Sequence, residues 1–231
     1  YLTYYLQNHF GYSPLRTGIA FLPMIGALVA TAPTAGQFLL RRLGTRGVLI
    51  LGIGIEAAAF AFLSRIDVDS AYAAAVVPGL LILGVGIGLV MPVAFNSGTR
   101  GIPGSHVGLA SAVLTVSQQI GASLGVALLA TYASRRVNMY VDEHAEQTKA
   151  QAMKALSQAQ ATPDSAAGQS IIARFTAELA DHAQISAYSG GFLLMACILI
   201  AVGALLAGLT APAALRRARA ALQARRSRRR D

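Results

Sequence analysis

The chain contains five long apolar stretches that are almost free of charged residues. Four of them carry no Asp, Glu, Lys or Arg: Thr17–Leu40, Ala71–Thr99, Val107–Ser134 and Ala183–Leu215. The fifth, Gly47–Ser64, carries one charged residue, Glu56. A helix needs about 20 apolar residues to cross roughly 30 Å of hydrocarbon. The pattern therefore predicts an all-α integral membrane protein that crosses the bilayer several times.

The composition agrees with this class and argues against an enzyme. Charged residues make up 13% of the chain, against about 25% in soluble domains, and the mean hydropathy is +0.54. One cysteine, Cys197, excludes a disulfide framework within the chain. No His, Cys, Asp or Glu cluster has metal-ligand spacing, and no nucleophile has a nearby base. We expect no catalytic residues, no metal and no cofactor.

The spans, loops and ends can be placed from the apolar runs and the charges between them. We expect five full transmembrane helices plus the end of a sixth, cut short at the N-terminus, and a polar helical loop broken at Pro163. That loop carries an amphipathic stripe that would lie on the membrane interface or cap the bundle. The expected segments are a helix tail at 1–9, spans at 17–40, 47–66, 72–97, 107–132 and 188–211, the loop at 133–187, and a basic tail at 212–231.

The basic residues are distributed unequally between the two sides that these spans define. Twelve Lys or Arg residues fall on the side of the Arg41–Arg46 turn and the C-terminal tail, and seven fall on the other side. We expect the protein to lie in the plasma membrane. The positive-inside rule then predicts that its C-terminus is cytoplasmic and that the 133–187 loop is extracytoplasmic. The arginine-rich tail follows a span directly and has no aromatic residue for base stacking. We expect it to contact anionic membrane lipid and not nucleic acid.

Several motifs resemble the C-terminal half of a major facilitator superfamily transporter, in the fourteen-span drug:proton antiporter subfamily. They are Tyr5-Leu6-Gln7 with Gly11-Tyr12-Ser13-Pro14-Leu15, Gly18 and Leu22-Pro23; Pro33-Thr34-Ala35-Gly36 with Arg41, Arg42, Gly44 and Arg46; Gly84 to Gly88 with Pro92; and Gly108-Leu109-Ala110-Ser111 with Ser117-Gln118-Gln119 and Gly121 to Gly125. The resemblance implies the last five of fourteen helices, with Gly36, Arg41, Arg42, Gly44 and Arg46 as a cytoplasmic loop motif. It also implies a major-facilitator-type helical bundle.

Glu56 is the candidate for proton coupling, because it lies near the middle of an apolar span. A charge at the bilayer centre costs at least roughly 2.5–3.5 kcal/mol on insertion scales. The carboxyl group must therefore face a wet cavity, pair with another group or stay protonated. A carboxyl that loads and releases a proton as a cavity opens to each side would suit a proton-coupled carrier. The alternative is a protonated structural glutamate that is hydrogen-bonded to a neighbouring helix.

Other polar and small residues in the spans are candidates for the substrate cavity and for helix packing. Gln118 and Gln119, with Thr115 one turn earlier, can contact substrate or form hydrogen bonds between helices; neighbours on a helix point about 100° apart, so the two glutamines face different directions. The G-x-x-x-G pairs allow close helix packing or flexibility during transport. The packing or hinge candidates are Gly84, Gly86, Gly88, Pro92, Gly121 and Gly125.

Together these observations predict the C-terminal half of a proton-coupled exporter of drugs or other amphipathic small molecules. Its partners would be the small amphipathic substrate, membrane lipid and a missing N-terminal half of the same transporter. The alternative is a non-transporting membrane fragment or assembly partner that needs a separate N-terminal half.

Overall fold

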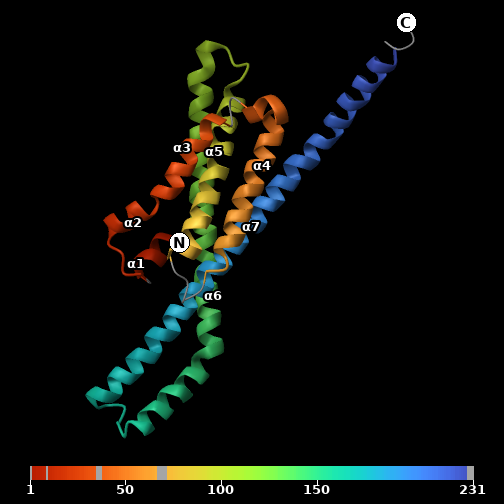
Figure 1. The fold of residues 1–231 in the computed structure, drawn as a ribbon. Helices are drawn as coiled ribbons and strands as arrows, with labels where there is room; N and C mark the ends of the chain where they lie inside the picture. The colour runs from red at the N-terminus through yellow and green to blue at the C-terminus, as the bar shows by residue number, and fades with distance from the viewer. Residues whose placement is uncertain (1, 9, 35–37, 67–71, 228–231) are drawn as a thin grey trace.

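The computed structural model describes residues 2–8, 10–34, 38–66 and 72–227, with only the backbone described beyond residue 209. Within these ranges the chain forms helices and turns, and no strand is present. The helices are α1 (Leu2–Asn8), α2 (Pro14–Ala20), α3 (Leu22–Thr34), α4 (Leu40–Leu63), the π-helical turn η2 (Tyr72–Val76), α5 (Val77–Thr99), the 3-10 turn η3 (Gly104–His106), α6 (Val107–Gln158) and α7 (Ala166–Ser227). They form a bundle from which α6 and α7 project together at one end (Figure 1).

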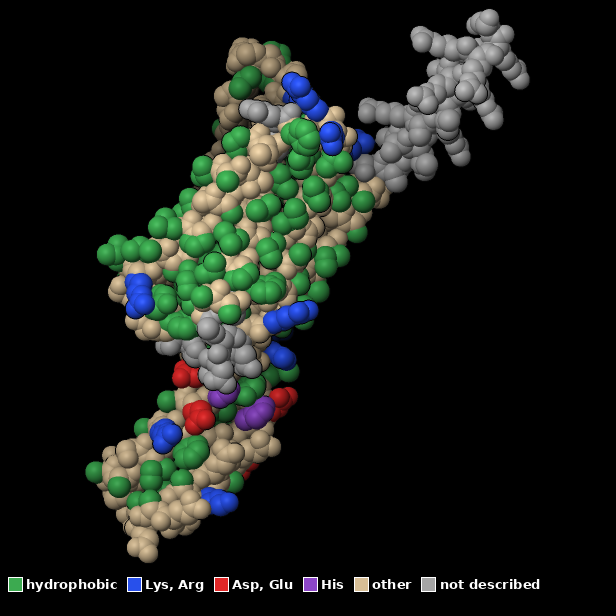
Figure 2. Space-filling view, in the orientation of Figure 1, with side chains coloured by type: hydrophobic (Ala, Val, Ile, Leu, Met, Phe, Trp, Pro, Cys, Tyr) green, Lys and Arg blue, Asp and Glu red, His purple; other side chains and the backbone are tan. Residues whose placement is uncertain are grey.

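Within the described residues, five helical segments are long and apolar enough to cross a membrane. They are Pro14–Thr34, Leu40–Leu63, Tyr72–Thr99, Gly104–Gln158 and Ala166–Leu209. Figure 2 shows hydrophobic side chains over the face of the bundle, with Asp, Glu and His side chains gathered toward the end where α6 and α7 project. The predicted all-α membrane fold with five spanning helices is confirmed. The segment expected as the end of a sixth helix contains the short helix α1.

The first span is broken, although its sequence is continuously apolar. Ser13 caps α2 by accepting a hydrogen bond from the Arg16 backbone N–H at 3.3 Å, with Pro14 at the first helical position. Pro23 lacks the N–H that would bond to the Ile19 carbonyl, and its ring disfavours a continuous helix there. The helix accordingly breaks at Phe21, and the Tyr72 hydroxyl donates to the Ala20 carbonyl oxygen at 2.6 Å. Two helices, α2 and α3, thus replace one regular span.

The helix α5 lies between α3 and α4, and its glycines allow both neighbours to approach. A Cβ on Gly84 would collide with the Met24 carbonyl oxygen, and one on Gly88 would come within 2.8 Å of the Leu28 carbonyl oxygen, both in α3. The contact between α4 and α5 also depends on a glycine of α4: a Cβ on Gly52 would lie 2.6 Å from a methyl group of Val90 in α5. Small residues at such crossings let apolar helices pack closely in a bilayer.

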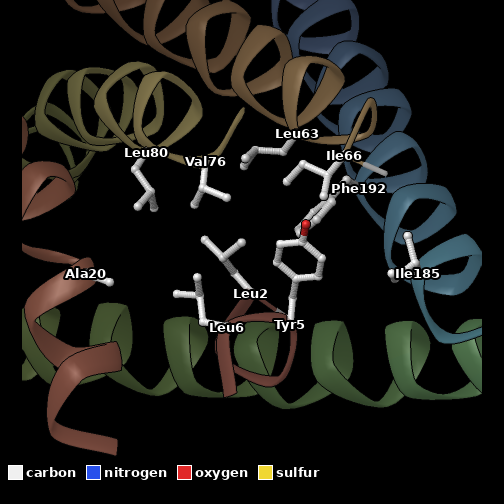
Figure 3. Close-up of a cluster of buried hydrophobic side chains, with 10 residues drawn as sticks. All are labelled: Leu2, Tyr5, Leu6, Ala20, Leu63, Ile66, Val76, Leu80, Ile185 and Phe192. Atoms are coloured by element: carbon white, nitrogen blue, oxygen red, sulfur yellow. The ribbon is translucent and has the colours of Figure 1, made fainter. Parts of the chain in front are cut away.

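A cluster of buried side chains closes the end of the bundle from which α6 and α7 project, here called the hairpin end. Figure 3 shows that the cluster draws on α1, α2, the end of α4, the start of α5 and α7. Phe192 of α7 is stacked on Phe60 of α4, with ring centroids 6.2 Å apart. The buried members are Leu2, Tyr5, Leu6, Ala20, Leu63, Ile66, Val76, Leu80, Ile185 and Phe192. In this cluster, helices that are distant in the sequence pack against one another.

The predicted 133–187 loop is largely a continuation of two long helices. We call residues 133–187 the hairpin: α6 runs on to Gln158, a short turn follows that contains Pro163, and α7 returns from Ala166. Gln160 adopts a positive φ of 51° in this turn. The segment projects from the bundle as an antiparallel pair of helices (Figure 1). Charged residues such as Arg135 and Arg136 end the apolar run without ending the helix, because both are good helix formers.

Candidate functional site

A hollow of about 350 Å³ lies between α4, α5 and α6. Two of the described lining side chains are polar, Glu56 from α4 and Gln118 from α6. The remaining lining residues are apolar: Ile87, Val90, Met91, Ala94, Phe95 and Leu114. The structure thus brings together two candidates that are 62 positions apart in the sequence and that were identified for different reasons.

Glu56 is half-buried at the crossing of α4 and α5. A Cβ on Gly86 would lie 2.5 Å from the Glu56 Cγ and 3.0 Å from its backbone nitrogen. The missing side chain of Gly86 is therefore what leaves room for the Glu56 side chain beside α5. Among the residues that the structure describes, no basic side chain lies within ion-pair distance of Glu56. The carboxyl group is thus available to a proton or to a ligand in the hollow.

The two glutamines on α6 differ in position, as expected for neighbours on a helix. Gln118 lines the hollow and Gln119 does not. Thr115 also lies outside the lining, and its hydroxyl donates to the Ser111 carbonyl oxygen at 3.0 Å. Thr115 therefore satisfies its donor within its own helix. Of the three cavity candidates on α6, Gln118 is the one that the geometry places beside Glu56.

The apolar wall of the hollow consists mainly of one face of α5, which the motif search did not single out. Its members recur at intervals of three and four residues: Ile87, Val90, Met91, Ala94 and Phe95. Such spacing is the signature of a single helix face. In a helix that is apolar all round, however, sequence periodicity cannot say which face lines a cavity. Pro92 lies between these positions and removes the backbone hydrogen bond to the Gly88 carbonyl, next to the site.

The remaining glycine candidates fall into two groups. Gly84, Gly86 and Gly88 on α5 meet atoms of α3 or α4, as described above. A Cβ on Gly121 or Gly125 of α6 would meet no atom of the described residues within 4 Å, so both positions are open to a further partner. The same G-x-x-x-G spacing therefore occurs in two environments, one packed against neighbouring helices and one open.

The candidate loop motif lies at the other end of the bundle, away from the hairpin. Gly44 adopts φ 68° and ψ 170°, a backbone conformation that favours glycine, and it interrupts α4 between Arg42 and Arg46. The Arg42 guanidinium lies over the Phe38 ring, 4.4 Å from its centroid. Arg41 lies on the same segment, and Gly36 falls outside the described residues. The expected turn is thus a break within α4 and not a separate loop.

Comparison with known proteins agrees with the class that the fold defines, a helical protein of the membrane. The family model of the Major Facilitator Superfamily matches residues 1–126. The chain therefore belongs to the Major Facilitator Superfamily. The matching relatives are named as transporters and export proteins and not as enzymes.

Three curated relatives illustrate the range of names in the family. A puromycin resistance protein of Streptomyces alboniger is 36% identical over 147 residues, 62% of this chain and 29% of the relative. A tetracenomycin C resistance and export protein of Streptomyces glaucescens is 31% identical over 63% of this chain and 27% of the relative. A triacylglyceride transporter of Mycolicibacterium smegmatis is 30% identical over 87% of this chain and 34% of the relative. The chain spans about a third of the length of these relatives.

Proposed function

We propose that this chain is the C-terminal half of an exporter of drugs or other amphipathic small molecules. The observation that carries the proposal is the hollow in which Glu56 and Gln118 meet an apolar wall. Ligand sites of this kind bury most of a small molecule against apolar side chains, and a few polar groups fix its orientation. Relatives named for resistance to or export of puromycin and tetracenomycin C support the same function.

Proton exchange is the coupling that the site supports best. Glu56 lies within an apolar span and has no basic partner among the described residues, so its ionised form is costly unless water or a cationic substrate reaches it. A proton can neutralise the carboxyl while the hollow is closed to water. Opening of the hollow to one side then favours release of that proton. Glu56 would thus load protons on one side of the membrane and release them on the other.

A missing N-terminal half would cover the face of the bundle that α6 leaves open. None of the residues in the most apolar window of α6 is buried in the described chain. Large apolar side chains are exposed along it, among them Leu109, Val113, Val116, Ile120 and Leu124. In transporters built from two repeated halves, the substrate lies between the halves. The open hollow beside Gln118 and the unfilled space over Gly121 fit this arrangement.

The alternative of a non-transporting fragment or assembly partner is not favoured by the comparisons. The named relatives are transporters, export proteins and resistance proteins of the same family. Both readings require a second half, and they differ in whether the assembled protein moves a substrate. Export by the complete protein distinguishes them.

We place the protein in the plasma membrane, with the C-terminal tail in the cytoplasm and the hairpin outside. The twelve-to-seven distribution of basic residues supports this orientation. Single cysteines at Ala161 in the hairpin turn and at Ala224 in the tail, in an otherwise cysteine-free protein, test it. An impermeant maleimide added to intact cells is expected to label the cysteine at 161, and to label that at 224 only after permeabilisation. The reverse pattern contradicts the orientation.

The proposed substrate site is tested by a pair of neighbouring substitutions. Gln118→Ala is expected to weaken puromycin export about tenfold at low substrate, because a buried hydrogen bond to the ligand is lost. Gln119→Ala, the matched control outside the lining, is expected to change it less than about twofold. Puromycin uptake into inverted vesicles at several concentrations provides the measurement. Equal effects of both changes, or none from either, argue against a substrate site in this hollow.

A further inference from the structure

A second hollow, of about 360 Å³, lies at the hairpin end of the bundle, outside the site described above. It is formed where the end of α4 meets the α6 and α7 helices of the hairpin. Ile66 and Ile185, which belong to the buried cluster of Figure 3, form its apolar base. Its other lining residues are polar: Ser64, Arg65, Tyr140, His182, Ser186 and Ser189.

The polar lining consists of groups that can donate hydrogen bonds. A guanidinium, three serine hydroxyls, a phenol and an imidazole are present, and none of the described lining residues is a carboxylate. Another hollow, which shares Tyr140 and His182 and lies between α6 and α7 of the hairpin, differs because Glu178 lines it. Two of the hydroxyls are engaged within their own helices: Ser64 donates to the Ala61 carbonyl oxygen at 2.9 Å and Ser189 to that of Ser186 at 3.1 Å. Rotation of these hydroxyls would turn both donors toward a ligand in the hollow.

Arg65 supplies the positive charge of this hollow. Its side chain is exposed, and no carboxylate among the described residues lies within ion-pair distance of it. By contrast, the Arg16 guanidinium, which follows Ser13 at the same end of the bundle, lies over the Tyr12 ring, 4.2 Å from its centroid. The flanking charges on the hairpin are mixed: Arg135 and Arg136 precede Tyr140 by about one turn of α6, and Asp142 and Glu143 follow it. Among the described lining residues Arg65 carries the charge, and it makes the hollow suited to an anion.

The position of the hollow identifies the kind of anion. Arg65 lies two residues after Leu63, the last residue of the spanning helix α4, and Ser189 lies where α7 enters its apolar run. This is the level at which a spanning helix leaves hydrocarbon and meets lipid headgroups. Guanidinium and hydroxyl donors together match the several acceptor oxygens of a phosphate.

We propose that this hollow binds the phosphate group of an anionic phospholipid headgroup. The phosphate would be held between Arg65 on α4 and the hydroxyls of Ser186 and Ser189 on α7. A bound headgroup would thereby link the outer end of α4 to the base of the hairpin. The site is separate from the Glu56 hollow, so its existence does not depend on which substrate the transporter carries.

Binding of short-chain lipids to the purified full-length protein in detergent tests the proposal. The probes are dihexanoyl phosphatidylglycerol, inorganic phosphate and dihexanoylglycerol, which has the same chains but no phosphate. We expect Arg65→Ala to weaken phosphatidylglycerol binding about tenfold or more, because charge-assisted hydrogen bonds are lost. Arg16→Ala, the matched control, is expected to leave it within about twofold. Native mass spectrometry counts the bound lipids, and melting curves without lipid show that each variant is folded.

The outcomes are distinct from one another. Phosphatidylglycerol binding at least about tenfold tighter than inorganic phosphate identifies the lipid as the ligand. Equal affinity for the two, still lost in Arg65→Ala, identifies a site for free phosphate. Partial recovery of phosphatidylglycerol binding in Arg65→Lys supports the same phosphate site, and so does weaker binding in Ser186→Ala. Neither of these two changes removes a large side chain. Unchanged binding in Arg65→Ala, equal loss in Arg16→Ala, or equal binding of dihexanoylglycerol overturns the proposal.

Discussion

Uphill export is expected to collapse when Glu56 is replaced by glutamine, while substrate still binds. Glutamine keeps the size of the side chain and its hydrogen-bonding capacity but cannot exchange a proton. Glu56 lines the hollow and has no basic partner among the described residues, so fixing it in the neutral state is expected to remove the proposed coupling step. We expect export against a substrate gradient to fall about tenfold or more, in line with the cost of a charge within the membrane. Dye or puromycin export from vesicles at several pH gradients measures the effect.

A control separates this role from general damage. Glu143→Gln makes the same chemical change at an exposed position of the hairpin, and export should stay at the wild-type level. If Glu56 were a protonated structural residue, Glu56→Gln would be almost silent, because glutamine resembles the neutral acid. Undiminished uphill export by Glu56→Gln therefore contradicts the proton-carrying role and leaves the structural one.

The second large effect is expected at Gly86, which leaves room for Glu56. In Gly86→Ala the new Cβ would lie 2.5 Å from the Glu56 Cγ, 3.0 Å from its backbone nitrogen and 3.1 Å from the Gly52 carbonyl oxygen. Overpacking of this kind costs about 1–3 kcal/mol, and two of the three contacts are backbone atoms that cannot rotate away. We expect a lower melting temperature for the purified protein, together with loss of export.

Gly54 provides the matched glycine for this test. It lies two residues from Glu56 on α4, and a Cβ there would meet no atom of the described part of the chain within 4 Å. Gly54→Ala should therefore melt near the wild-type temperature. In the double variant Gly86→Ala with Glu56→Ala, removal of the Cγ should restore part of the lost stability but not export. A Gly86→Ala protein that melts and exports like the wild type would show that α4 and α5 do not approach each other closely at Glu56.

The spanning helices could be predicted from the sequence because bilayer thickness sets the length of an apolar run. The break at Phe21 was missed because the residues on both sides are equally apolar; Pro23 was the available signal. The extent of α6 was also missed, since Arg135 and Arg136 mark a membrane boundary and not a helix end. Charge reports the environment of a residue, while helix termination depends on backbone geometry.

The candidate site could be predicted in part. Glu56 and Gln118 stood out because polar groups are rare in such spans. That they share one hollow depends on how α4, α5 and α6 cross, which no local pattern encodes. The same limit applies to the glycines: Gly84 and Gly88 face α3, whereas Gly121 and Gly125 face open space at identical spacing. Which G-x-x-x-G pair has a partner within the chain is a tertiary property.

The account depends most on the claim that substrate occupies the hollow lined by Glu56 and Gln118. Single cysteines at Gln118 and Gln119 test this claim most directly, in a protein from which Cys197, an exposed thiol, and any other cysteine have been removed. The rate of labelling by a membrane-permeant maleimide is measured with and without saturating puromycin. We predict that puromycin slows labelling at position 118 several-fold, by about five- to tenfold, and leaves labelling at position 119 unchanged. Equal rates with and without puromycin at position 118 would contradict the account.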